Sequence, residues 1–151
     1  MVGISLFLFR MEVAAFRLLS IERFAVNLMT SQTIVLVVED DPILRQIYRQ
    51  SLERRNYLIH EASNGEEALE KLKEISPQVI ILDMMMPGMG GPTMLQKIRQ
   101  NPELAKIRIV VITAYPQFRE SALHYEVDQF LTKPLRPADI VKAIETALDS
   151  A

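Results

Sequence analysis

The chain has 151 residues, of which 49% are hydrophobic and 24% are charged, and its formal net charge is −2. This length suits one domain of ordinary size, and the composition is typical of a soluble globular protein. A net charge of −2 argues against nucleic-acid binding, which needs a basic patch, and the absence of cysteine excludes disulfides and thiolate-bound metals.

Residues 1–30 differ in character from the rest of the chain. The opening apolar run, Val2–Phe9, is far shorter than the roughly 20 residues needed to span a bilayer. No basic residue precedes it and no small-residue cleavage site follows, so we expect neither a membrane span nor a secretory signal. From Met11 onward, the spacing of polar residues predicts an amphipathic helix for a partner, a dimer or a membrane surface. The alternative, weighted equally, is a misassigned start codon, with the functional chain beginning at Met29.

From Thr33 onward, short apolar runs alternate with helical patterns, which predicts βαβ units and a parallel sheet. The expected strands are residues 34–38, 57–62, 79–82, 109–112 and 129–132. The expected helices are residues 42–52, 66–75, 92–100, 117–125 and 138–148. Five strands and five helices in strict alternation predict an α/β, doubly wound architecture.

The central predicted strand, Val79–Leu82, consists of four apolar residues, too few for a helix and typical of a fully buried parallel strand. Asp83 follows directly, and a Pro87-Gly88 turn comes soon afterwards. An aspartate in this position lies at the carboxyl edge of the sheet, where open α/β folds bind ligands. Aspartate is also a common turn residue, so this strand alone does not decide its role.

Polar residues also follow the other predicted strands. They are Glu39, Asp40 and Asp41 after the first strand, Thr113 after the fourth and Lys133 after the fifth. Because parallel strands end at one edge of a sheet, we expect Glu39, Asp40 and Asp83 to share one small cleft.

Carboxylates gathered in this way repel one another, by about 4 kcal/mol per pair at 4 Å and an effective dielectric constant of 20. The sequence therefore predicts a bound cation. Oxygen ligands favour Mg²⁺, and the lack of cysteine and of a histidine near any strand end argues against zinc. With a positive charge from Lys133 and a hydroxyl from Thr113, the cleft is suited to a transferring phosphoryl group.

Four runs together resemble a response-regulator receiver domain of the CheY-like kind: IVLVVEDDP, VIILDMMMPGMGG, IVVITA and FLTKP. The resemblance extends over about residues 33–148. It implies a flavodoxin-like, five-stranded parallel sheet with strand order 2-1-3-4-5 and five helices. The expected organisation is an N-terminal extension, residues 1–30, followed by a receiver domain, residues 31–151.

The resemblance also implies roles for individual residues. Asp83 would accept a phosphoryl group from a sensor histidine kinase or a phosphotransfer protein. Asp40 and Asp83 would bind Mg²⁺ directly, Glu39 would bind it through water, and Met85 would contribute its backbone carbonyl.

Three further positions match residues that bind or sense the phosphoryl group. Lys133 would bind the phosphoryl oxygens, Thr113 would move to hydrogen-bond one of them, and Phe130 would be the aromatic switch residue. Phe130 is equally consistent with an ordinary core position. His60 and His124 belong to no expected site, and Asp41 is suited to cap the helix that begins at Pro42.

The chain departs from the usual family pattern in four ways. Glu39 replaces the commoner aspartate, and Phe130 replaces the commoner tyrosine. Thr113 and Lys133 are 20 positions apart (133 minus 113), about two fewer than usual. Residues 125–128 replace the usual Gly-Ala before the fifth strand, which would shorten the fourth helix and its exit loop.

We therefore interpret the sequence as a stand-alone, cytoplasmic phosphoacceptor receiver that acts on an unidentified downstream protein through its surface. It would not be an enzyme, apart from slow self-dephosphorylation. One alternative is a receiver-fold adaptor that works without phosphorylation, and another is a magnesium-dependent aspartyl phosphatase. The apolar face of residues 1–30 would dock near the shortened fourth helix, on the same chain or in a homodimer.

Overall fold

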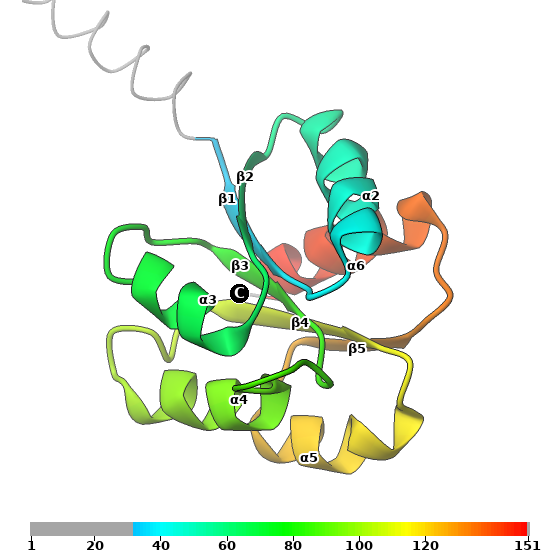
Figure 1. The fold of residues 1–151 in the computed structure, drawn as a ribbon. Helices are drawn as coiled ribbons and strands as arrows, with labels where there is room; N and C mark the ends of the chain where they lie inside the picture. Colours follow the sequence, from blue (N-terminus) through cyan, green and yellow to red (C-terminus); the bar gives the residue numbers. More distant parts are fainter. Residues whose placement is uncertain (1–31, 151) are drawn as a thin grey trace, which may run out of the picture. The chain divides into compact units, whose positions relative to one another are not determined.

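The computed structural model describes residues 32–150, which form a single parallel sheet with helices on both faces (Figure 1). The strands are β1 (Ile34–Val38), β2 (Leu58–Ala62), β3 (Val79–Leu82), β4 (Arg108–Thr113) and β5 (Gln129–Thr132). The helices are α2 (Pro42–Glu53), α3 (Gly65–Lys71), α4 (Gly91–Gln100), α5 (Arg119–His124) and α6 (Pro137–Asp149), with a 3₁₀ turn, η1 (Pro116–Phe118), before α5. The expected amphipathic helix in residues 1–30 lies outside the described residues.

The strand order is β2-β1-β3-β4-β5, as predicted, and every neighbouring pair is parallel. Successive side chains of a strand point to opposite faces, so each central strand contributes to two cores. Leu36 and Val38 face the layer formed by α3, α4 and α5, whereas Val35 and Val37 face α2 and α6 (Figure 1). The central strands β1 and β3 are apolar throughout because both faces of the sheet are covered there, whereas the edge strands β2 and β5 also contain polar residues.

Two predicted helices differ from the structure. The helix expected over residues 66–75 ends at Lys71, because the following residues close tighter i→i+3 turns, such as Lys73 N–H to the Glu70 carbonyl. Ile75 still packs against the core from this turn. The helix expected over residues 117–125 is divided into η1 and α5, because Arg119 N–H bonds to the Pro116 carbonyl in a 3₁₀ turn.

The helices of residues 32–150 are too short or too polar to cross a bilayer.

Candidate functional site

Three carboxylates meet at the carboxyl edge of the sheet. Glu39 and Asp40 follow β1, Asp83 follows β3, and these strands pair in register up to Val38 and Leu82. Asp83 N–H extends the pairing with a 3.0 Å hydrogen bond to the Val38 carbonyl. One carboxylate oxygen from each acidic residue lies within 4.8 Å of the others. The clustering predicted from the strand ends is therefore present.

Lys133 supplies a cation to this cluster from the end of β5. Its Nζ atom lies 2.7 Å from Glu39 Oε2 and 3.2 Å from Asp83 Oδ2. Its backbone N–H also bonds to the Thr113 carbonyl at 2.9 Å, which ties the end of β5 to the end of β4. From the sequence, we expected a metal ion to neutralise most of the charge of these carboxylates. In the structure, the ammonium group itself offsets the repulsion between Glu39 and Asp83.

Burial and ion pairing have opposite effects on the pKa of Glu39, and likewise on the pKa of Lys133. Burial of Glu39, which is 1% exposed, raises the pKa of its carboxyl, and the hydrogen bond from Lys133 only partly opposes this. Burial also opposes the charge of Lys133, but its hydrogen bond to Glu39 and its attraction to Glu39 and Asp83 outweigh this and raise the pKa of the ammonium group. Lys133 therefore remains charged, and the site gains from any further cation that stabilises ionised Glu39.

The remaining carboxylate oxygens differ in their partners. Glu39 Oε1 accepts a 3.3 Å hydrogen bond from Asp41 N–H, and Asp83 Oδ1 accepts one of the same length from Met85 N–H. Within residues 32–150, the carboxylate of Asp40 accepts no hydrogen bond and forms no ion pair, and Asp40 is the most exposed of the three acidic residues. This set of oxygens fits Mg²⁺, which binds one or two carboxylates and keeps several waters.

Met85 and Thr113 border the cluster without completing the expected contacts. Met85 bonds to Asp83 through its N–H, and the residue is 47% exposed; metal binding by its carbonyl stays a prediction. Thr113 is fully buried at the end of β4, and its hydroxyl accepts a 3.3 Å hydrogen bond from Tyr115 N–H. Among the described residues, no hydrogen bond joins this hydroxyl to Asp83, so its role with a phosphoryl group also stays a prediction.

Phe130 is partly buried on β5 and packs against the core beneath α4 and α5. The guanidinium carbon of Arg119 lies 4.6 Å from the centre of its ring, in a cation–π contact. The two histidines lie outside the acidic cluster, His60 in β2 and His124 at the end of α5. Neither histidine is part of the acidic cluster, and the expectation that they have no role in the site stays a prediction.

Asp41 caps α2, as its position before Pro42 predicted. Its Oδ1 atom accepts hydrogen bonds from Ile43 N–H at 2.8 Å and Leu44 N–H at 3.2 Å. These bonds satisfy two of the N–H groups that the start of a helix leaves without a partner. Asp41 therefore has a structural role and stands beside the acidic cluster without joining it.

Two sets of hydrogen bonds that support the site were not predicted from the sequence. Arg45 donates hydrogen bonds to the backbone carbonyls of Glu39 and Asp40. On the other side, both carboxylate oxygens of Glu66 accept from Met89 N–H, at 2.9 and 3.1 Å, and so hold the loop that follows β3. Neither contact leaves a signal in the sequence, because each joins side chain to backbone across separate elements.

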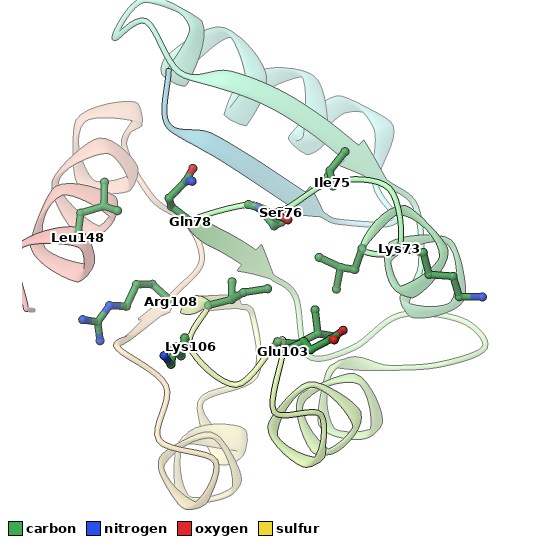
Figure 2. Close-up of a pocket in the computed structure, with 12 residues that line it drawn as sticks. Lys73, Ile75, Ser76, Gln78, Glu103, Lys106, Arg108 and Leu148 are labelled. Atoms are coloured by element: carbon green, nitrogen blue, oxygen red, sulfur yellow. The ribbon is translucent and has the colours of Figure 1, made fainter. Parts of the chain in front are cut away.

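A separate groove of about 580 Å³ lies at the opposite edge of the sheet (Figure 2). It is lined by residues that precede or begin β3 and β4, including Gln78 and Arg108, and by Leu148 near the end of α6. No residue of the acidic cluster lines this groove. The cluster is therefore distinct from this groove.

Comparison with known proteins gives a consistent result. The family model described as "Response regulator receiver domain" matches residues 35–145. The transcriptional regulatory protein ResD of Bacillus subtilis is 35% identical over 124 residues, which cover 81% of this chain and 50% of ResD. The chain thus spans about half the length of this curated relative.

Solved structures show the same similarity. The chemotaxis response regulator CheY4 of Vibrio cholerae has a TM-score of 0.74 and 27% identity, with 78% of this chain and all of CheY4 covered. The response regulator TrrA of Thermotoga maritima, in complex with Mg²⁺ and BeF, has a TM-score of 0.70 and 29% identity, with 78% of this chain and all of TrrA covered.

Proposed function

The chain belongs to the family of response regulator receiver domains of two-component signalling, and we propose that Asp83 is its phosphoacceptor. The phosphoryl donor would be a sensor histidine kinase or a phosphotransfer protein. The output would be a change in the surface of the domain that an unidentified downstream protein recognises. This proposal keeps the function expected from the sequence and rests on the geometry of the acidic cluster.

One observation carries the proposal: the carboxylates of Glu39, Asp40 and Asp83 converge beside the Lys133 ammonium group. Asp83 is 5% exposed, so its oxygens are partly shielded from water yet lie at the open edge of the sheet. Lys133 already binds Asp83 Oδ2 and can stabilise negative charge that develops there. An ordinary turn aspartate would need neither the acidic pair of Glu39 and Asp40 nor the lysine.

Mg²⁺ would be held by Asp40 and Asp83, by Glu39 through water, and by the Met85 carbonyl. When bound, the ion neutralises phosphoryl oxygens and lowers the barrier to attack by a carboxylate. The open carboxylate of Asp40 supports this assignment, because it has no competing partner among residues 32–150. The relative TrrA, solved with Mg²⁺ and BeF, adds support by similarity.

In the proposed reaction, a carboxylate oxygen of Asp83 attacks the phosphorus atom of the donor. The new O–P bond forms as the bond between phosphorus and the donor breaks, and the electron pair leaves with the donor. Lys133 neutralises the added charge from its place beside Asp83, and the Thr113 hydroxyl would donate to a phosphoryl oxygen. The aspartyl phosphate carries close to two negative charges, which drives rearrangement of the groups around it.

Acetyl phosphate with Mg²⁺ tests the proposal directly. We expect intact mass spectrometry to detect one added phosphoryl group on the wild-type chain and none on Asp83→Asn. Asp41→Asn is a matched control, because it removes one charge next to the cluster while asparagine still caps α2. Equal labelling of Asp83→Asn would refute the assignment of Asp83.

Two measurements on the wild-type chain distinguish the proposed receiver from the two alternative functions. A phosphatase would turn over added phosphomonoesters, whereas the proposed receiver would release only the phosphoryl group that it carries. An adaptor that works without phosphorylation would not be labelled by acetyl phosphate. Either result would replace the proposed function by the corresponding alternative.

A further inference from the structure

We propose that Arg45 is a positioning residue that fixes the backbone of Asp40 for metal binding; this inference rests on the proposed function of the acidic cluster. Arg45 is the fourth residue of α2, at the end of its first turn, and its side chain is 22% exposed. Its Nη1 atom donates to the Glu39 carbonyl at 2.7 Å and to the Asp40 carbonyl at 3.4 Å.

These two carbonyls belong to the peptide groups on either side of Asp40. A single guanidinium that holds both peptide groups restricts both backbone dihedrals of Asp40, and these dihedrals set the direction of its side chain. The restriction matters at this position because the pairing of β1 with β2 ends at the 3.1 Å hydrogen bond from Glu39 N–H to the Ala62 carbonyl and does not reach Asp40. The carboxylate of Asp40 itself accepts no hydrogen bond within residues 32–150, which leaves its placement to the backbone.

Arg45 is held from its other side by Glu61 on β2. Its Nε atom lies 3.9 Å from Glu61 Oε1, while Arg49, one turn further along α2, binds Glu61 Oε2 at 2.8–2.9 Å through two nitrogens. Arg45 and Arg49 thus share Glu61, which lies closer to Arg49 than to Arg45. Arg49 also binds Glu53, but its described hydrogen bonds and ion pairs do not reach Glu39 or Asp40.

A positioning role for Arg45 and a purely electrostatic effect of its charge predict opposite changes in Mg²⁺ affinity. The positive charge of Arg45 near the cluster repels Mg²⁺, so removing it should tighten Mg²⁺ binding if charge were its only effect. If Arg45 positions Asp40, its removal should weaken Mg²⁺ binding in spite of the more favourable charge. Loss of a group that orients metal ligands typically weakens metal affinity by about 10–100-fold.

The test measures Mg²⁺ affinity by calorimetric titration for the wild type, Arg45→Ala, Arg45→Lys and Arg49→Ala. We expect binding about tenfold weaker for Arg45→Ala. Arg45→Lys keeps the charge but has one nitrogen, which cannot contact the two carbonyls and Glu61 as Nη1 and Nε of Arg45 do, so it should also weaken binding. Arg49→Ala is the matched control, because it removes an arginine from the same helix and the same Glu61, and it should bind like the wild type.

A second measurement uses the protein without metal. Amide hydrogen exchange at Asp40 and Asp41 should be faster in Arg45→Ala than in the wild type or Arg49→Ala, because the restraint on these peptide groups is lost. Thermal unfolding of each variant shows that it is folded, and Arg45→Lys keeps the test decisive if Arg45→Ala does not fold.

The outcomes separate this inference from the proposed function. Unchanged or tighter Mg²⁺ binding in both Arg45 variants, with a wild-type chain that binds Mg²⁺, would overturn the positioning role alone. Equal weakening in Arg49→Ala would overturn it as well, since the effect would then come from Glu61 or from α2 in general. A wild-type chain that neither binds Mg²⁺ nor becomes labelled at Asp83 would remove the proposed function and this inference together.

Discussion

The ammonium group of Lys133 lies 2.7 Å from Oε2 of Glu39, a carboxylate that is almost fully shielded from solvent. The same nitrogen lies 3.2 Å from Asp83 Oδ2, so Lys133 links the acidic residue after β1 to the proposed phosphoacceptor after β3. A buried carboxylate that loses its partner is costly, so this contact stabilises the site in the absence of metal.

Replacement of Lys133 by methionine should destabilise the chain and increase its response to Mg²⁺. Breaking a buried ion pair costs about 3–5 kcal/mol, and we expect roughly 2–3 kcal/mol here because water reaches Lys133. Mg²⁺ should restore more stability in this variant than it adds to the wild type, since it replaces the lost cation. Urea unfolding with and without Mg²⁺ measures both effects.

Lys73→Met is the control for this prediction. Lys73 pairs with Glu70 at 2.6 Å, but both side chains are exposed, so the loss should be below about 1 kcal/mol and independent of Mg²⁺. Wild-type stability and a wild-type Mg²⁺ response in Lys133→Met would contradict the role given to Lys133.

Asp40→Asn should weaken Mg²⁺ binding without loss of stability in the metal-free chain. The Asp40 carboxylate accepts no hydrogen bond within residues 32–150 and lies among other carboxylates, so its removal leaves no unsatisfied partner and relieves repulsion. We expect Mg²⁺ affinity to fall about tenfold or more and the urea midpoint to stay the same or rise. Asp41→Asn, with the same change in charge, should keep its affinity; a fall equal to that of Asp40→Asn would indicate a general charge effect.

Gly91→Ala should disturb the backbone at Asp83. A Cβ atom at Gly91 would lie 2.6 Å from both the Asp83 carbonyl oxygen and the Met84 Cα, which are backbone atoms that cannot rotate away. Overpacking of this kind costs about 1–3 kcal/mol, and we also expect slower labelling by acetyl phosphate. The urea midpoint and the labelling rate measure the two effects.

Gly90→Ala provides a neighbouring comparison. Its Cβ would lie 3.3 Å from the Met84 carbonyl oxygen, and its φ of −77° is open to alanine, so we expect a cost below about 1 kcal/mol. Similar losses of stability in the two variants would show that the close contact of Gly91 with the Asp83 backbone does not exclude a side chain at position 91.

Glu67 should contribute stability that is lost in acid. Hydrogen bonds from the Ser63 N–H and hydroxyl, at 2.8 and 2.7 Å, lower the pKa of Glu67 from 4.5 to about 2. Because the folded state favours the carboxylate, this stability is fully present above pH 4.5 and is lost as the pH falls toward 2. Its size should be below about 1 kcal/mol, since the side chain is 40% exposed and screened by water.

Glu67→Gln should therefore lower stability at neutral pH and flatten its pH dependence in this window. Urea unfolding at a series of pH values provides the measurement. Glu70→Gln is the control, because Glu70 is 71% exposed and its one described ion pair is with Lys73 at the surface. An unchanged pH dependence in Glu67→Gln would show that the bonds from Ser63 do not favour the carboxylate.

The sequence predicted the central strands β1, β3 and β4 well because each contains a short apolar run that both faces of the sheet bury. It was less reliable at helix ends. The helix that ends at Lys71 continues as tight turns that keep Ile75 against the core, so its apolar spacing imitates a longer helix. The boundary between η1 and α5 could not be predicted from the sequence either, because residues are similarly spaced in 3₁₀ and α-helical turns.

The sequence by itself also determined which residues gather at the site, because the carboxyl ends of parallel strands share one edge whatever the details of packing. Only the tertiary structure decided how they pair. Lys133 meets Glu39 and Asp83 across 94 and 50 positions of sequence, and its choice of partner depends on the directions of side chains at three strand ends. Arg45 binds backbone carbonyls, which every residue has, so no residue type in the sequence could mark this contact.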